Sequence, residues 1–138
     1  MSEEQIVLRP IGVVESTLTD AASAPKQGDE GAPDAGLAFD PAVSEGLRNL
    51  AVGDEVVLLT WLDRADRDVL VVQPRNDPAR PEQGVFSTRS PARPNPIGLH
   101  RVTILAIDGL KMQVSNLEAV DGTPVLDVKP VLRGIDER

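Results

Sequence analysis

The feature that most constrains the fold is a pair of strand-like runs on either side of residues 108–109. "HRVTILAI" (100–107) leads into Asp-Gly, and every second residue of "LKMQV" (110–114) is apolar. Alternation with a period of two places the apolar side chains on one face of a strand. Asp-Gly between two such runs predicts a β-hairpin with a type I′ turn, which needs positive φ at both central positions.

Other segments also favour extended backbone. A second Asp-Gly, at 121–122, predicts another tight turn. Val, Leu and Ile must build most of the core, because the chain has two Phe, one Trp and no Tyr. The segments expected to be extended are 6–17 with a break at Pro10, 55–62 as a strand buried on both faces, 69–73, and the short "GVFST" at 84–88.

One short helix is expected in "FDPAVSEGLRNL" (39–50), where Asp40 is a suitable N-cap and Pro41 suits the first helical position. The Ala-, Gly-, Pro- and acid-rich stretch 18–36 is expected to form a surface loop. The prediction is therefore an all-β fold, a mainly antiparallel small β-barrel with one short helix, in a single domain over residues 1–138.

Composition excludes several classes of site. The chain has no cysteine and one histidine, which excludes thiolate and multi-histidine metal sites, so no metal is expected. It contains no G-x-G, no P-loop and no G-x-S-x-G motif. The N-terminus does not resemble a signal peptide and no apolar run reaches membrane-spanning length, which predicts a cytoplasmic protein.

The charge distribution is uneven. The net charge of −8 argues against unspecific nucleic-acid binding, because neutralising phosphates requires positive surface. Residues 83–107, however, contain no Asp or Glu, and they include Arg89, Arg93 and Arg101. This basic segment is the most suitable place for an anionic ligand.

Two interpretations of "RSPARPNPIG" (89–98) stay open. Prolines fix φ and bias the preceding residues toward extended backbone. The segment is either a surface connector whose arginines pair with nearby acids, or a preorganised wall that directs Arg89, Arg93 and the Asn95 carboxamide into a pocket. Gly98 would let the following strand approach closely. By itself, "LEAVDGTPVLDVKP" (117–130) is either a turn with an exposed ion pair or a binding turn, and "APKQG" (24–28) is ordinary loop sequence.

These three segments together resemble one family. "GVFSTRSPARPNPIG" (84–98) is similar to the G-V-F-x-T-R-S-x-x-R-P-N-P-I-G signature of the TsaA-like, or tRNA methyltransferase O (YaeB-like), family at every defined position. "LEAVDGTPVLDVKP" resembles its L-D-x-x-D-G-T-P-V-x-D-I-K-P motif, with Glu118 for the acid and Val128 for Ile. "APKQG" and the segment "IGVVES" (11–16) also agree with the family.

The resemblance implies a small β-barrel that forms a homodimer and binds S-adenosylmethionine near the dimer interface. It implies methylation of N6 of threonylcarbamoyladenosine at tRNA position 37, with tRNA held through the basic 83–107 segment. The cofactor-binding positions that it implies are Lys26, Gln27, Gly28, Asp63, Arg64, Ala65, Asp66, Arg93, Thr103, Ala119, Val120, Asp121 and Gly122.

Chemistry suggests roles for some of these residues. Arg93 would bind the donor's carboxylate through a bidentate fork, and Asp121 would accept hydrogen bonds from the donor's ribose or ammonium group. Asn95 and Arg89 are the predicted catalytic residues. By analogy with unrelated adenine-N6 methyltransferases, the Asn95 carboxamide and a neighbouring proline carbonyl would orient the target amine.

The sequence also departs from the family. Asp63 replaces a frequent His, Val131 replaces a frequent Tyr, and the chain ends at Arg138 without the C-terminal region of longer members. Two alternatives therefore accompany the tRNA methyltransferase: an enzyme of the same family with a different or small substrate, and a non-catalytic S-adenosylmethionine-binding module.

Overall fold

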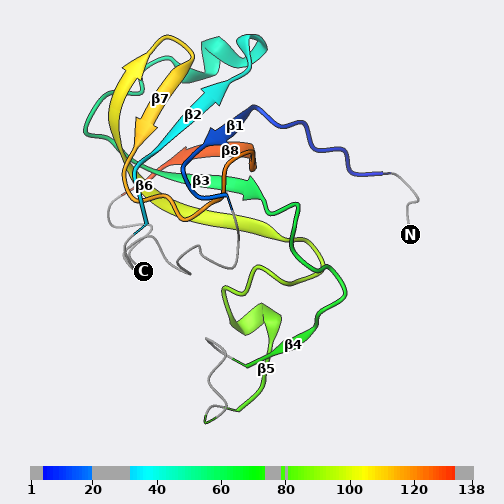
Figure 1. Ribbon diagram of the computed structural model, residues 1–138. Helices are drawn as coiled ribbons and strands as arrows, with labels where there is room; N and C mark the ends of the chain where they lie inside the picture. The colour runs from blue at the N-terminus through cyan, green and yellow to red at the C-terminus, as the bar shows by residue number, and fades with distance from the viewer. Residues whose placement is uncertain (1–4, 20–31, 74–78, 80, 133–138) are drawn as a thin grey trace.

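A closed barrel of antiparallel strands forms the centre of the molecule (Figure 1). The computed structural model describes residues 5–19, 32–73, 79 and 81–132. Within this part of the chain, the strands follow the order β1-β2-β7-β6-β3-β8, and β8 pairs with β1 to close the ring. Their bounds are β1 Gly12–Glu15, β2 Ala35–Phe39, β3 Glu55–Trp61, β6 Ile97–Asp108, β7 Lys111–Val114 and β8 Pro124–Pro130. The predicted all-β class is confirmed.

Alternate residues of the strands fill the barrel. The largest fully buried aliphatic side chains of the barrel core come from different strands and from the segment after β7: Val14, Leu37, Val56, Leu58, Ile104, Val114, Leu117 and Val125. Such alternation produces one inward and one outward face on each strand. The core is therefore largely aliphatic, with Phe39 and Met112 as the exceptions, as the composition predicts.

The hairpin predicted at residues 100–117 is present, but its turn differs. Asp108 pairs with Lys111, so the central residues are Gly109 and Leu110. Only Gly109 has positive φ, +60°. Positive φ at the first central position alone, with glycine there, is typical of a type II′ turn. The prediction of a type I′ turn, which needs positive φ at both positions, was therefore wrong. Both types suit the right-handed twist of paired strands.

Three strand predictions need correction. β1 covers only Gly12–Glu15, because residues 6–8 are exposed and unpaired before Pro10. β3 is not buried on both faces: Val56, Leu58 and Thr60 are buried, and the residues between them are half-buried. β2 was missed, since the stretch 18–36 was expected to be a loop and the strand begins at Ala35.

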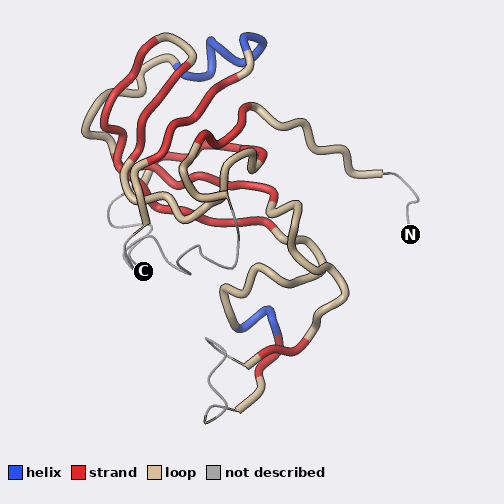
Figure 2. Tube along the Cα trace, viewed as in Figure 1, coloured by secondary structure: helices blue, strands red, loops and turns tan. Residues whose placement is uncertain are grey.

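Between β3 and β6 the chain leaves the barrel and returns, and the described residues 62–73 and 81–96 form this excursion (Figures 1 and 2). The excursion carries a two-stranded ribbon of β4 (Val71–Val72) and β5 (Gln83–Gly84). The expected strand 69–73 is thus reduced to two residues. "GVFST" is not extended: η4 (Val85–Ser87) is a turn of 3-10 helix.

The predicted short helix is confirmed in place, as the 3-10 helix η2 (Pro41–Leu47). The Asp40 side chain accepts a hydrogen bond from the Ala42 amide at 2.9 Å, as an N-cap does. Val43 and Leu47 pack against the barrel core. Of the helices in the described ranges, none has the length and apolar character that crossing a bilayer requires.

Candidate functional site

The Asp121 turn is bound to the segment that follows β1. The Val120 carbonyl accepts a hydrogen bond from the Thr123 amide at 3.2 Å, and Gly122 has φ of +85°, which only glycine adopts easily. The Asp121 amide donates to the Leu18 carbonyl at 2.6 Å, and Asp121 Oδ1 accepts from the Ser16 amide at 3.0 Å. The predicted cofactor residues of this turn are therefore held beside residues 16–18.

The 63–66 turn follows β3 and lies beside Thr19, the residue after 16–18 in the segment that follows β1. Arg64 Nη1 donates to the Thr19 carbonyl at 3.0 Å. Within the 63–66 turn, the Ala65 amide donates to the Leu62 carbonyl at 3.0 Å, which fixes the backbone of the turn locally. The Asp66 carbonyl accepts from the Arg93 amide at 3.0 Å. The structure therefore brings together three of the motifs that the sequence marked.

Arg93 and Arg89 do not act as a pair. The half-buried Arg93 guanidinium donates to the Thr88 carbonyl, at 3.1 and 3.3 Å, and to the Val85 carbonyl. It thereby holds η4 and the start of the proline-rich segment in shape. Arg89 is exposed and has no side-chain partner within the described ranges. Within that part of the chain neither arginine pairs with an acid, so the ion pairs of the connector interpretation are not found there.

Asn95 is exposed and is bound by a residue that sequence reasoning missed. Arg67 Nη2 donates to Asn95 Oδ1 at 3.0 Å, and Arg67 Nε donates to the Pro94 carbonyl at 2.7 Å. The same guanidinium lies 5.2 Å from the centroid of the Trp61 ring. Arg67 directly follows the stretch 63–66, which the family resemblance marked as cofactor-binding. This position beside a marked stretch is the one sequence signal that could have pointed to Arg67 as a site residue.

A buried polar network was also missed. His100 Nε2 lies 2.7 Å from Thr60 Oγ1, and His100 Nδ1 lies 2.5 Å from Glu118 Oε1. Thr60 and His100 are almost fully buried. Gly98 makes room for this network, because a Cβ on residue 98 would lie 2.6 Å from His100 Nε2 and closer still to Thr60 Oγ1. Glu118 connects the network to the turn that holds Asp121.

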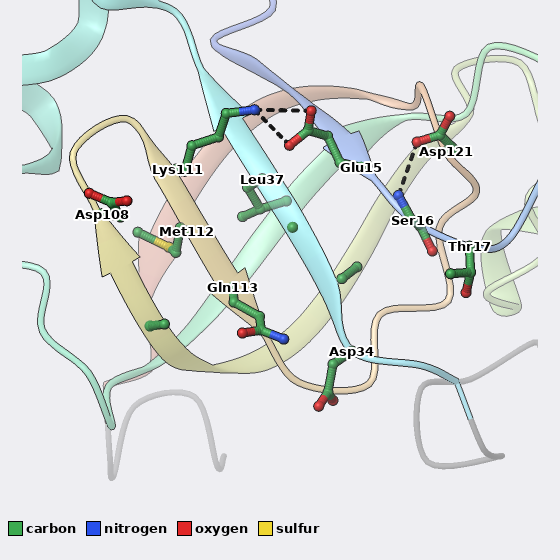
Figure 3. Close-up of a pocket in the computed structure, with 13 residues that line it drawn as sticks. Glu15, Ser16, Thr17, Asp34, Leu37, Asp108, Lys111, Met112, Gln113 and Asp121 are labelled. Atoms are coloured by element: carbon green, nitrogen blue, oxygen red, sulfur yellow. Dashed lines mark hydrogen bonds and ion pairs between the residues drawn. The ribbon is translucent and has the colours of Figure 1, made fainter.

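An open groove of about 530 Å³ lies over β1, β2 and β7, beside the Asp121 turn (Figure 3). Lys111 Nζ reaches across it to both carboxylate oxygens of Glu15, at 2.9 and 3.1 Å. Asp34, Asp108 and Asp121 also line the groove, so it carries more negative than positive charge. Ligand sites commonly have volumes of about 300–1,000 Å³.

The described structure does not place every predicted residue in this assembly. Lys26, Gln27 and Gly28 lie outside the described residues. Thr103 is on β6 opposite Glu55, whereas Ile97 is opposite Trp61, six residues along the same strand. Six residues of strand span about 20 Å. Within one chain, Thr103 is thus far from the 63–66 turn.

In the 117–130 segment, the exposed ion pair of one interpretation is present: Lys129 Nζ lies 3.6 Å from Asp127 Oδ2.

Comparison with known proteins identifies relatives along nearly the whole chain. Residues 13–137 match the tRNA-methyltransferase O N-terminal domain. A probable S-adenosyl-L-methionine-binding protein of Methanothermobacter thermautotrophicus is 40% identical over 136 residues, which cover 99% of this chain and 97% of the relative. An S-adenosyl-L-methionine-binding protein of Archaeoglobus fulgidus is 40% identical over 131 residues, covering 95% and 93%.

Other relatives are longer. A second Archaeoglobus fulgidus protein, a probable S-adenosyl-L-methionine-binding protein, is 42% identical over 131 residues, which cover 95% of this chain but 35% of the relative. A crystal structure of TrmO superposes with a TM-score of 0.78 and 30% identity, covering 98% of this chain and 61% of that one. TrmO from Pseudomonas aeruginosa gives a TM-score of 0.77 and 27% identity, covering 99% and 60%.

The chain therefore spans about three fifths of the solved TrmO chains and about a third of one curated relative. The family match over residues 13–137, the named relatives and the fold all indicate the same family as the motifs at 84–98 and 117–130. The chain belongs to the TsaA-like, tRNA-methyltransferase O family.

Proposed function

We propose that this protein binds S-adenosylmethionine and transfers its methyl group to N6 of threonylcarbamoyladenosine at position 37 of tRNA. The observation that carries the proposal is the joining of the Asp121 turn, residues 16–19, the 63–66 turn and Arg93 by hydrogen bonds. Family membership and relatives named as S-adenosyl-L-methionine-binding proteins support the identity of the donor.

The donor would lie against the Asp121 turn. Asp121 is exposed, and one of its carboxylate oxygens is used by the Ser16 amide, which leaves the other for the ribose hydroxyls or the ammonium group. The acidic groove beside this turn suits a ligand that carries a sulfonium and an ammonium cation. Binding the donor's carboxylate through Arg93 would require its guanidinium to share or leave the Val85 and Thr88 carbonyls.

The acceptor would be held at the Asn95 end of the proline-rich segment. The exocyclic amine of adenine is a weak nucleophile, because its lone pair is delocalised into the ring. The Asn95 carboxamide oxygen and the Pro94 carbonyl both accept from the one Arg67 guanidinium, so they face the same space. N6 of threonylcarbamoyladenosine carries the carbamoyl group and therefore one N–H, which either oxygen in this arrangement could accept. Transfer is an in-line displacement: the N6–CH3 bond forms as the donor's S–CH3 bond breaks, S-adenosylhomocysteine leaves and the N6 proton passes to solvent. Alignment of the donor and N6 therefore supplies most of the rate.

We also propose that the protein acts as a homodimer. Several large apolar side chains of the described chain are exposed. Ile97 and Leu99, at 41% and 47%, lie on the outer face of β6, and Phe86, at 81%, lies on η4. Exposed apolar surface of this kind commonly marks an interface. A partner subunit would also explain how Thr103, remote from the 63–66 turn, could contribute to a donor site. Light scattering or sedimentation at micromolar concentration tests the mass.

Charge favours a second candidate. With 22 acidic and 14 basic residues, the chain is poorly suited to unspecific contacts with phosphates. A methyltransferase with a small neutral acceptor, or a module that binds the donor without turnover, therefore remains the alternative. These candidates differ in salt dependence, because phosphate contacts weaken steeply as ionic strength rises and contacts to a neutral acceptor do not.

The experiment is labelled-methyl transfer from S-adenosylmethionine into total tRNA from a strain lacking the gene, run beside calorimetric titration of the donor. Saturable donor binding with label in tRNA, falling steeply between low and moderate salt, supports the proposal. Donor binding without transfer supports the binding module, and absence of donor binding overturns both. Asn95→Ala at saturating donor should lose transfer, whereas Gln73→Ala, an exposed carboxamide of the same excursion, should not.

A further inference from the structure

We propose that Arg67 is a positioning residue, whose guanidinium holds the Pro94 carbonyl and the Asn95 carboxamide in the geometry that the target amine needs. The inference rests on the function proposed above, in which Asn95 orients that amine. Arg67 itself need not touch the donor or the acceptor.

The contact geometry supports this role. Two different N–H groups of one planar guanidinium donate to two consecutive residues, at 2.7 Å to Pro94 and 3.0 Å to Asn95. The guanidinium fork is rigid, so it fixes the two acceptor oxygens relative to each other as well as to itself. Its stacking on the Trp61 ring, at the end of β3, fixes the guanidinium in turn.

The carboxamide has no local substitute for this donor. Asn95 stands between two prolines, which have no amide hydrogen. The Ile97 amide, the next one along the chain, donates to the Asn95 main-chain carbonyl at 2.7 Å and is therefore used. In the described part of the chain, Arg67 is the residue whose donor fixes Oδ1. Without it, the exposed Asn95 side chain would rotate.

The two acceptor oxygens can serve Arg67 and a substrate together. A carbonyl oxygen has two lone pairs, so either oxygen can accept from Arg67 and still accept the single N6–H of the acceptor. Positioning therefore does not require that the guanidinium leave when the substrate binds.

Arg67 also connects the two halves of the proposed reaction. It follows the 63–66 turn, assigned above to the donor, and it bonds to the segment assigned to the acceptor. The Asp66 carbonyl, which accepts from the Arg93 amide, gives a second connection. Because methyl transfer depends on alignment, a loosened connection should lower the rate of the chemical step more than the affinity for either ligand.

The test compares the full chain with Arg67→Ala, Arg67→Lys and the control Arg48→Ala, an exposed arginine whose partner is Glu45 on η2. We expect Arg67→Ala to lower kcat for tRNA methylation about 100-fold, because misplacement by about 1 Å costs that much. The KM for S-adenosylmethionine should change less than about threefold. Arg67→Lys, with a point charge and no fork, should recover only part of the rate. Arg48→Ala should behave as the unchanged protein.

Two readouts do not depend on activity. In ¹⁵N spectra, the Asn95 side-chain amide signals, identified by their loss in Asn95→Ala, should move toward random-coil positions in Arg67→Ala and not in Arg48→Ala. The fluorescence of Trp61, the sole tryptophan, should shift as well. Absence of methylation by the unchanged protein would count against the proposed function, while these spectra still decide whether Arg67 orders Asn95.

Three results would overturn the inference. Unchanged Asn95 signals in Arg67→Ala would show that the carboxamide is ordered by something else. Full recovery by Arg67→Lys would show that charge matters and the fork does not. A higher kcat in Arg67→Ala would show that the guanidinium occupies the place of the amine.

Discussion

Gly98→Ala should destabilise the barrel strongly, although it adds only one methyl group. The new Cβ would lie 2.6 Å from His100 Nε2 and closer still to Thr60 Oγ1. Both atoms belong to the buried Thr60–His100–Glu118 network, so neither side chain has free space into which to move. Gly98 has no positive φ, which means that the backbone itself would accept alanine.

The magnitude follows from two costs. Overpacking a filled interior costs about 1–3 kcal/mol. Separating Thr60 from His100 leaves buried polar atoms without partners, at about 1–3 kcal/mol more. Better strand propensity returns about 0.5–1 kcal/mol. We therefore expect a loss of about 3 kcal/mol, the centre of the range of about 1–5 kcal/mol that these costs span, which lowers the melting temperature by on the order of 10 °C for a domain of this size.

The assay is chemical denaturation followed by far-UV circular dichroism, with Gly46→Ala as the matched control. A Cβ at residue 46 meets no atom within 4 Å, and its φ is not positive, so this change should be neutral or slightly stabilising. The double variant Gly98→Ala/His100→Ala should lose less stability than the sum of the losses in the two single variants, by about 1 kcal/mol or more. Wild-type stability of Gly98→Ala, or strict additivity, would refute the reasoning.

Two further changes test other contacts. Arg93→Ala should raise the amide exchange rate of Thr88, which donates to the Val85 carbonyl, by about tenfold or more, because the guanidinium no longer holds that carbonyl; unchanged exchange in the ligand-free protein would contradict the assigned role. Asp40→Ala should cost about 1 kcal/mol through loss of the η2 cap, whereas Asp40→Asn should cost little, as thermal melting can measure; equal losses in the two variants would argue against capping.

Local sequence patterns predicted the strands that pair with a strand close to them in sequence. The hairpin at 100–117 combines alternation with a glycine-containing turn, and both signals lie within a few residues. β2 gave no such signal, since "AGLAF" contains Gly36, Ala35 and Ala38, which favour strands weakly. Its extended form depends on pairing with β1 and β7, both distant in sequence. A single-sequence reading has no access to that pairing.

The site shows the same limit. The 84–98 and 117–130 motifs marked candidate segments, and hydrogen bonds connect these by way of residues 16–19 and the 63–66 turn. Arg67 lies in the charged turn "DRADRD", where solvent exposure explains any single charge, and its partners are 27 and 28 residues away. His100 and Glu118 stand 18 residues apart. Only the barrel register reveals that they meet.

Asp121 is the residue for which a structural role and a binding role can be separated most cleanly. Its Oδ1 already accepts from the Ser16 amide, so the turn alone could explain an acid here. Asp121→Asn keeps that acceptor and removes the negative charge. If the carboxylate contacts the donor's ammonium or ribose, Asp121→Asn should melt as the unchanged protein does. Its affinity for S-adenosylmethionine should fall about 10–100-fold, which corresponds to one charge-assisted hydrogen bond.

Asp121→Ala completes the comparison, since it removes the Ser16 contact as well and should lose about 1 kcal/mol of stability besides the affinity. Calorimetric titration and thermal melting of the three proteins give both quantities. Unchanged donor affinity in Asp121→Asn, together with lower stability in Asp121→Ala, would mean that Asp121 serves the turn alone. The donor's cationic end would then have to be bound by other acids of the groove, such as Asp34 or Glu15.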